Sequence, residues 1–97
     1  MEKFKNKVAL ITGGTKGIGR GVAEALLELG MNVVITSRSL ENATDVAKEL
    51  QDKYNGKADV LGVEADVRNY ESQEQAVKKT IEKFGQLDVL VANAGLG

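Results

Sequence analysis

The chain has 97 residues, enough for one small domain, and its 42% hydrophobic and 28% charged residues are typical of a globular protein. Thirteen basic and fourteen acidic side chains leave a net charge of -1, so we expect neither nucleic acid nor a membrane surface as a partner. Without Cys or His, the chain has no disulfide, no thiol chemistry, no zinc site of the usual kind and no imidazole base. The first apolar run has only five residues, too short for a signal sequence or a membrane span, which predicts a cytoplasmic protein.

Four short apolar runs alternate along the chain with segments of helical periodicity. The runs are nearly continuous, as is typical of strands buried on both faces of a parallel sheet, and they cover residues 8–12, 33–36, 60–63 and 89–92. The first helix should end at Gly30. Its expected apolar stripe consists of Ile18, Val22, Ala25, Leu26 and Leu29. Ser39 and Asn69 are expected to cap the second and third helices, which end before Gly56 and Gly85. The expected inner face of the third helix consists of Val77, Ile81 and Phe84.

This β-α-β-α-β-α-β order, with connections of a few residues, predicts an α/β fold: a Rossmann-type parallel sheet with helices on both faces. We expect the strand order 3-2-1-4, with the first two helices on one face of the sheet and the third on the other. The fourth strand is then an edge. Leu87, Val89 and Val91 are expected on one face of it, and Leu90 and Ala92 on the other. An open apolar edge favours pairing between chains, so we expect a homo-oligomer.

Four glycines follow the first strand within seven positions, Gly13 to Gly19. Between a strand and a helix, such a loop leaves backbone N–H groups and the positive end of the helix dipole open to an anion, and a pyrophosphate can approach closely where Cβ atoms are missing. The spacing is not the most familiar dinucleotide fingerprint, and Arg20 and Gly21 stand where a P-loop needs Lys and Ser or Thr. A turn that only packs the helix tightly onto the sheet is the alternative interpretation.

Three motifs in order, each at the end of a predicted strand, resemble the classical short-chain dehydrogenase/reductase family: TGGTKGIG (residues 12–19), Asp66-Val67, and NAG (residues 93–95). The resemblance implies that the backbone from Thr15 to Gly19 holds the pyrophosphate and the nicotinamide ribose. It also implies that Asp66 accepts a hydrogen bond from the adenine amino group and that Asn93 contacts the adenine-side ribose. Ala92 departs from the family, which often has a second Asn there, but Asn93 is intact. The candidate cofactor-binding residues are Gly13, Thr15, Lys16, Gly17, Ile18, Gly19, Ser37, Arg38, Asp66, Val67, Asn93, Ala94 and Gly95.

The end of the second strand predicts which cofactor is bound. A carboxylate at this position usually holds the ribose hydroxyls of NAD and repels a 2′-phosphate. Here Ser37 removes that charge, Arg38 offers a planar guanidinium, and Lys16 in the glycine loop adds a second cation, as in family members that use NADP. We therefore expect NADP as the cofactor; the alternative is that both cations are solvated surface charges.

The proton chemistry of the family depends on a Tyr-x-x-x-Lys pair beyond the fourth strand, and this chain does not contain it. Tyr54 is followed four positions later by Ala58, and Tyr70 by Glu74. We therefore predict no catalytic residue and no metal site here. Residues 1–97 are expected to be the N-terminal dinucleotide-binding half of an oxidoreductase, a fragment or truncated chain that lacks the catalytic half and is inactive alone.

The expected reaction of the whole protein is NADP(H)-dependent hydride transfer between the nicotinamide and a small carbonyl or alcohol substrate. A non-catalytic nucleotide-binding Rossmann module is the main alternative. An epimerase or dehydratase of the extended family would be expected to have Gly where this loop has Lys16.

Overall fold

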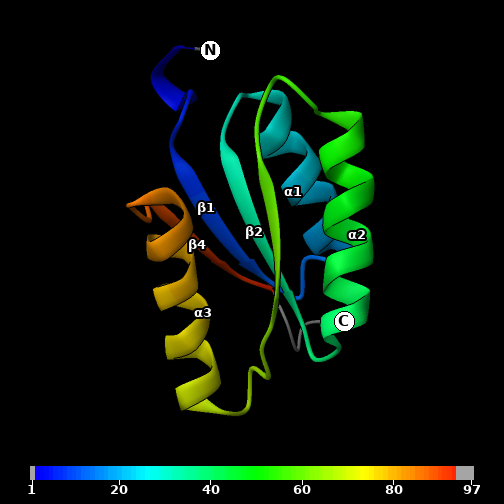
Figure 1. Ribbon diagram of the computed structural model, residues 1–97, viewed down its shortest axis with the longest axis vertical. Coiled ribbons are helices and arrows are strands. Elements are labelled where there is room, and N and C mark those ends of the chain that lie inside the picture. Colours follow the sequence, from blue (N-terminus) through cyan, green and yellow to red (C-terminus); the bar gives the residue numbers. More distant parts are fainter. Residues whose placement is uncertain (1, 94–97) are drawn as a thin grey trace.

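The computed structural model describes residues 2–93, which form one parallel sheet covered by helices on both faces (Figure 1). The strands are β1 (Val8–Thr12), β2 (Asn32–Ser37), β3 (Val60–Glu64) and β4 (Val89–Ala92). The helices are a short 3-10 turn η1 (Glu2–Phe4), α1 (Gly17–Glu28), α2 (Leu40–Lys53) and α3 (Tyr70–Phe84). The order β3-β2-β1-β4 and the α/β class confirm the predicted fold. Between residues 2 and 93, no helix is both long and apolar enough to cross a membrane.

The helix ends follow the predicted capping residues. The Ser39 hydroxyl accepts a hydrogen bond from the Asn42 N–H at 3.1 Å, and the Asn69 side chain accepts one from the Ser72 N–H at 3.2 Å. Gly85 ends α3 with a φ of 80°, the left-handed conformation that favours glycine at this position. These signals act within a few residues and could be read directly from the sequence.

Two apolar cores lie on opposite faces of the sheet. Ile11 of β1 pairs in register with Ile35 of β2 and Val91 of β4, and their side chains face α1 and α2. The next residue along β1 toward the N-terminus, Leu10, faces α3 together with Val34. The sheet is therefore covered by α1 and α2 on one side and by α3 on the other, as Figure 1 shows.

The buried face of α1 differs from the predicted stripe by one position. The buried residues are Gly19, Ala23 and Leu27, whereas Ile18 is 79% exposed and Ala25 is also exposed. The predicted Val22 and Leu26 pack only partly against the core. The physical reason is that Gly19 has no side chain and Ala23 has only a methyl group, so this face lets the helix approach the sheet most closely.

Two further expectations about apolar residues were partly wrong. Of the inner face predicted for α3, Val77 and Phe84 pack against the α3-side core, but Ile81 is 47% exposed. The fully buried residues of this helix are Ala76 and Thr80, whose hydroxyl donates to the Ala76 carbonyl at 2.8 Å. Leu87 packs with the α3-side core rather than sharing a face with Val91. Leu87 precedes β4, so the alternation of strand residues does not extend to it.

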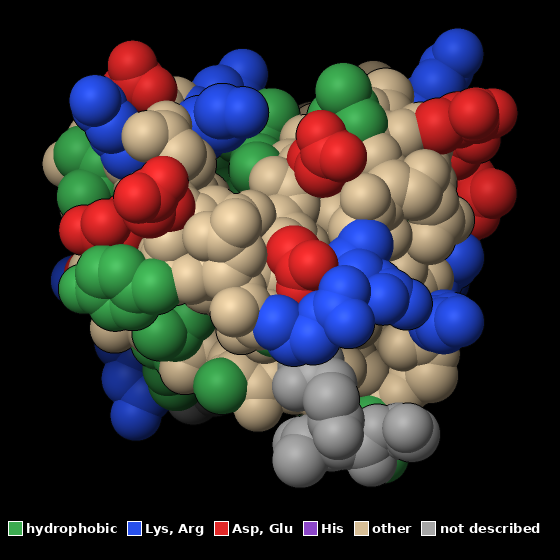
Figure 2. Space-filling view, turned by 90° about the horizontal axis from the view of Figure 1, so that it is seen from below, with side chains coloured by type: hydrophobic (Ala, Val, Ile, Leu, Met, Phe, Trp, Pro, Cys, Tyr) green, Lys and Arg blue, Asp and Glu red, His purple; other side chains and the backbone are tan. Residues whose placement is uncertain are grey.

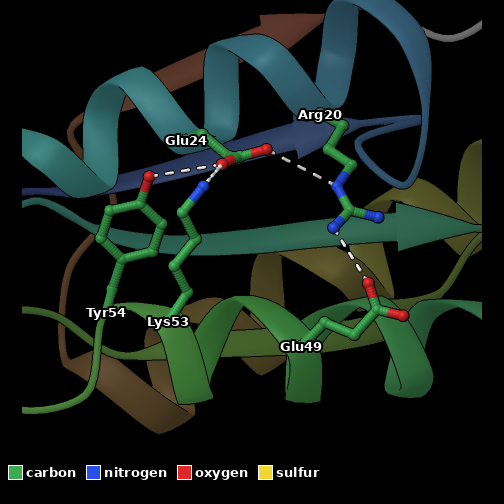
Figure 3. A network of polar contacts seen from close by, with 5 residues as sticks. All are labelled: Arg20, Glu24, Glu49, Lys53 and Tyr54. Carbon is green, nitrogen blue, oxygen red and sulfur yellow. Dashed lines mark hydrogen bonds and ion pairs between the residues drawn. The ribbon is translucent and has the colours of Figure 1, made fainter.

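Polar contacts tie α1 to α2 along their exposed sides (Figure 3). Glu24 accepts hydrogen bonds from Lys53 at 2.7 Å and from the Tyr54 hydroxyl at 3.3 Å, and the hydrogen bond from Lys53 lowers the pKa of Glu24. Arg20 donates to Glu49 at 2.9 Å and also pairs with Glu24 at 3.7 Å. Each exposed pair adds little stability by itself, but together they hold the two helices, and the loops that precede them, in one arrangement.

Candidate functional site

The predicted site residues lie at the carboxyl ends of the strands. The glycine loop follows β1, Ser37 ends β2, Asp66 and Val67 follow β3, and Asn93 follows β4. In open parallel sheets, ligands bind outside this edge where the strand order reverses, which here is between β1 and β4. Seen from this edge, Lys and Arg side chains gather beside an acidic side chain (Figure 2). The predicted Ala94 and Gly95 lie outside the described residues.

The first residue of the glycine loop is held from two neighbouring strands. The N–H of Gly13 donates to the hydroxyl of Thr36 in β2 at 3.2 Å. Its carbonyl accepts from Nδ2 of Asn93 at 3.2 Å, and the N–H of Asn93 donates to the Thr12 hydroxyl at 3.0 Å. Asn93 therefore fixes the loop to the end of β4, a structural role in addition to the ribose contact that the resemblance implies.

Glycine is required at different positions of the loop for different physical reasons. A Cβ at Gly14 would lie 2.7 Å from Cγ2 of Ile35, and one at Gly19 would lie 2.5 Å from both Asn93 Nδ2 and the Gly13 carbonyl oxygen. Gly17 has a φ of 60°, and apart from its chain neighbours and the nearby backbone of α1, no described atom would lie within 4 Å of a Cβ there, so its backbone conformation is what favours glycine. Close packing thus accounts for Gly14 and Gly19, and Gly17 leaves open space at the start of α1.

The N-terminus of α1 receives no capping hydrogen bond from its N-cap side chain. Lys16 is the N-cap residue, and its backbone is extended. The first turn contains no acidic residue, and the N–H of Arg20 donates back to the Lys16 carbonyl at 3.4 Å. The first N–H groups of a helix have no partner within it, and together with the positive end of the helix dipole they favour an anion here.

A side chain of α2 links the glycine loop to the end of β2. Nδ2 of Asn42 donates to the hydroxyl of Thr15 at 3.2 Å and to that of Ser37 at 3.3 Å. The Ser37 hydroxyl also accepts from the Ser39 N–H at 3.2 Å. This arrangement keeps Thr15 buried and places the Ser37-Arg38 turn beside the loop.

Lys16 and Arg38 are exposed cations at this edge of the sheet. Within residues 2–93, the Arg38 guanidinium forms no ion pair with a carboxylate. Together with the closer Arg68, its charge lowers the pKa of Asp66. The positive charge of Arg38 is therefore available to an anionic group from outside the described chain.

Asp66 is held by Arg68. Oδ1 of Asp66 accepts from the backbone N–H of Arg68 at 2.9 Å and from its Nε at 3.1 Å, and Oδ2 accepts from Nη2 at 3.0 Å. These hydrogen bonds lower the pKa of Asp66 from 3.8 to about 2, so the group is a carboxylate at neutral pH and can only accept hydrogen bonds. Val67 is 37% exposed beside it.

Three polar residues that are not among the candidates predicted from the sequence help to build this edge: Thr36, Asn42 and Arg68. Thr36 could have been identified from the sequence, because it is a polar residue at the end of an otherwise apolar strand. Asn42 stood in an expected helix, where an amide is ordinarily solvated. Arg68 gave no signal, because its pairing with a side chain two residues away depends on the geometry of the turn.

Residues 7–97 match the family model of the short chain dehydrogenases, which covers nearly the whole chain, including the glycine loop and Asn93. The chain belongs to the short chain dehydrogenase family. This short chain dehydrogenase sequence is 44% identical over 96 residues to an uncharacterized oxidoreductase of Staphylococcus saprophyticus. The match covers 99% of this chain but 40% of the relative, so the chain spans less than half of that protein's length.

Solved structures of the family share the fold. The L-sorbose reductase of Gluconobacter frateurii, complexed with NADPH and L-sorbose, is 35% identical with a TM-score of 0.87, over 94% of this chain and 34% of that one. A short chain dehydrogenase/reductase from Burkholderia phymatum, in complex with NAD, is 33% identical with a TM-score of 0.82, over 93% of this chain and 31% of that one. The chain is thus similar both to a structure with NADPH and to one with NAD.

Proposed function

We propose that residues 1–97 are the dinucleotide-binding half of an NADP(H)-dependent oxidoreductase that transfers a hydride between the nicotinamide and a carbonyl or alcohol substrate. Membership of the short chain dehydrogenase family and the similarity to cofactor-bound structures support a nicotinamide dinucleotide. The bound cofactor would supply the hydride. The residues of this chain would bind and orient it.

Each part of the cofactor has a chemically suitable partner at the carboxyl edge of the sheet. The N-terminus of α1, with no capping hydrogen bond from the Lys16 side chain, suits the pyrophosphate, and the open space at Gly17 leaves room for it. The carboxylate of Asp66 can accept a hydrogen bond from the adenine amino group. Asn93 lies beside Gly19 at the end of β4, a suitable position for the contact with the adenine-side ribose.

The guanidinium of Arg38, which forms no ion pair within residues 2–93, is the observation that carries the choice of NADP over NAD. Ser37 places no negative charge at the end of β2, and its hydroxyl already accepts hydrogen bonds from Ser39 and Asn42. Arg38 therefore presents a cation where the sequence of an NAD-binding member would usually present a carboxylate. A planar guanidinium suits a phosphate monoester especially well.

Replacing Arg38 with Ala tests this choice in the complete protein. We expect Arg38→Ala to weaken NADPH binding by about 10- to 100-fold, the effect of losing a charge-assisted hydrogen bond, and to change NADH binding little. Titration calorimetry with both cofactors measures the difference. The matched control is Lys57→Ala, which removes an exposed cation just before β3, at the opposite edge of the sheet.

Equal losses for NADPH and NADH, or no loss for either, would contradict the role of Arg38. Turnover is followed separately through the absorbance of NADPH with a panel of activated ketones. Tight binding of NADPH by the complete protein without any turnover would favour the non-catalytic nucleotide-binding module instead.

A further inference from the structure

The turn after β3 contains an ion pair between Asp66 and Arg68, and the proposed function gives no role to Arg68. Arg68 donates three hydrogen bonds to Asp66, two from its guanidinium and one from its backbone N–H. The Arg68 side chain is 73% exposed and that of Asp66 is 34% exposed, so the pair lies at the surface of the candidate site. An ion pair so exposed contributes little to stability, which leaves its geometry in need of another explanation.

The pairing decides how Asp66 can meet a ligand. A carboxylate has about four acceptor directions, and Arg68 fills two on Oδ1 and one on Oδ2. One direction on Oδ2 remains for a donor from outside the described chain. Because the carboxylate is also ionised, it accepts a hydrogen bond from an amino group and cannot donate one to an oxo group.

The pairing of Asp66 with Arg68 also affects whether the Arg38 guanidinium is free to bind an anion. The hydrogen bonds from Arg68 and, less strongly, the charge of Arg38 lower the pKa of Asp66, although Asp66 and Arg38 form no ion pair within the described residues. With both oxygens held by Arg68, Asp66 is not free to turn toward Arg38. Without Arg68, the same carboxylate would be an uncompensated anion beside the cation proposed to bind the 2′-phosphate, and it could neutralise that cation.

We propose that Arg68 is a positioning residue for the adenine end of the cofactor site, which holds Asp66 toward the base and thereby leaves Arg38 free for the 2′-phosphate. This inference rests on the proposed function. Arg68 would then contribute to two preferences of the site. Through Asp66 it would favour adenine over a 6-oxo purine, and through Arg38 it would favour NADPH over NADH.

The test measures both selectivities in the complete protein with Arg68→Ala. Calorimetric titrations use NADPH, NADH and their two analogues in which hypoxanthine, with a 6-oxo group, replaces adenine. We expect Arg68→Ala to reduce each preference, adenine over hypoxanthine and NADPH over NADH, by about tenfold, the equivalent of one charge-assisted hydrogen bond. Arg68→Lys keeps the charge but not the planar fork, so we expect it to restore the second preference more than the first. Lys83→Ala, which removes an exposed cation from the far end of α3, should change neither.

A double-mutant cycle shows whether Arg68 acts through Asp66. In an Asp66→Asn background, Arg68→Ala should have no further effect on either preference. An equal loss of affinity for all four cofactors, unchanged preferences, or a full effect that persists in the Asp66→Asn background would overturn the inference. If the unmodified protein bound none of the four, the proposed function itself would fail, and the inference with it.

Discussion

Arg68 lowers the pKa of Asp66 through hydrogen bonds that the folded turn provides and an unfolded chain does not. The folded-state pKa is about 2, against an ordinary value of 3.8. A carboxylate whose pKa is lowered by folding contributes stability that is fully present well above its unfolded pKa and is lost as the pH falls through the folded value. For Asp66, that window runs from about pH 4 to about pH 2.

Removing Arg68 should therefore change the acid titration of Asp66. We expect the pKa of Asp66 to return toward 3.8 in Arg68→Ala, because both side-chain hydrogen bonds and the neighbouring charge are lost. NMR of the side-chain carboxyl carbon over a pH series measures this directly. The effect on stability, followed by urea unfolding, should shrink as the pH falls below about 4. The idea would be contradicted by an unchanged pKa in Arg68→Ala or by a stability difference that grew in acid.

At the scale of elements, α1 is positioned by its smallest residues. Gly19 faces the Gly13 carbonyl and Asn93, while a Cβ at Gly21, in the same helix, would have no described atom within 4 Å apart from its chain neighbours and the nearby helix backbone. The two glycines have the same chemistry and differ only in what surrounds them. They form a matched pair for testing whether close packing determines the position of the helix.

We expect Gly19→Ala to destabilise the fold by about 1–3 kcal/mol, because the added methyl group would overlap backbone and side-chain atoms of the loop. Gly21→Ala should instead stabilise it by about 0.5–1 kcal/mol, because Ala favours a helix interior and has open space there. Urea unfolding of both variants gives the two changes with opposite signs. A Gly19→Ala variant as stable as Gly21→Ala would show that the loop yields to the methyl group.

In the molecule as a whole, β4 is an edge strand of the sheet with exposed apolar side chains. Within residues 2–93 its only strand neighbour is β1, and it exposes Val89 to 42% and Leu90 to 58%. Its outer backbone N–H and C=O groups therefore lie beside apolar side chains, an arrangement that favours pairing with another strand.

We predict that a protein of these 97 residues self-associates through β4. Leu90→Lys places a charge beside this edge and should shift the chain toward the monomer, whereas Leu40→Lys, at a leucine of α2 with a similar exposure of 53%, should not. Sedimentation over a concentration series measures both. A chain that sediments as a monomer at every concentration, and unfolds cooperatively, would disprove the argument from the exposed edge.

The helices and strands and their order along the chain could be predicted from local sequence patterns. Four apolar runs became four strands within one residue of the predicted bounds at each end. Ser39, Asn69 and Gly85 cap helices as predicted, since caps depend on residues only a few positions apart. The strand order followed from the chirality and connection rules of parallel sheets, and the positions of the candidate site residues after each strand followed from that order.

The contacts that those residues make could not be predicted, because they depend on how the whole chain packs. Periodicity could not select between two neighbouring faces of α1, because the choice depends on how closely Gly19 approaches Asn93, which follows β4. The hydrogen bonds of Gly13 to Thr36 and Asn93 likewise join three strands that meet only in the sheet. The pairing of Asp66 with Arg68 is close in sequence but depends on the shape of one turn. Local patterns encode where helices and strands form, whereas packing and polar contacts between distant segments form only when the whole chain is folded.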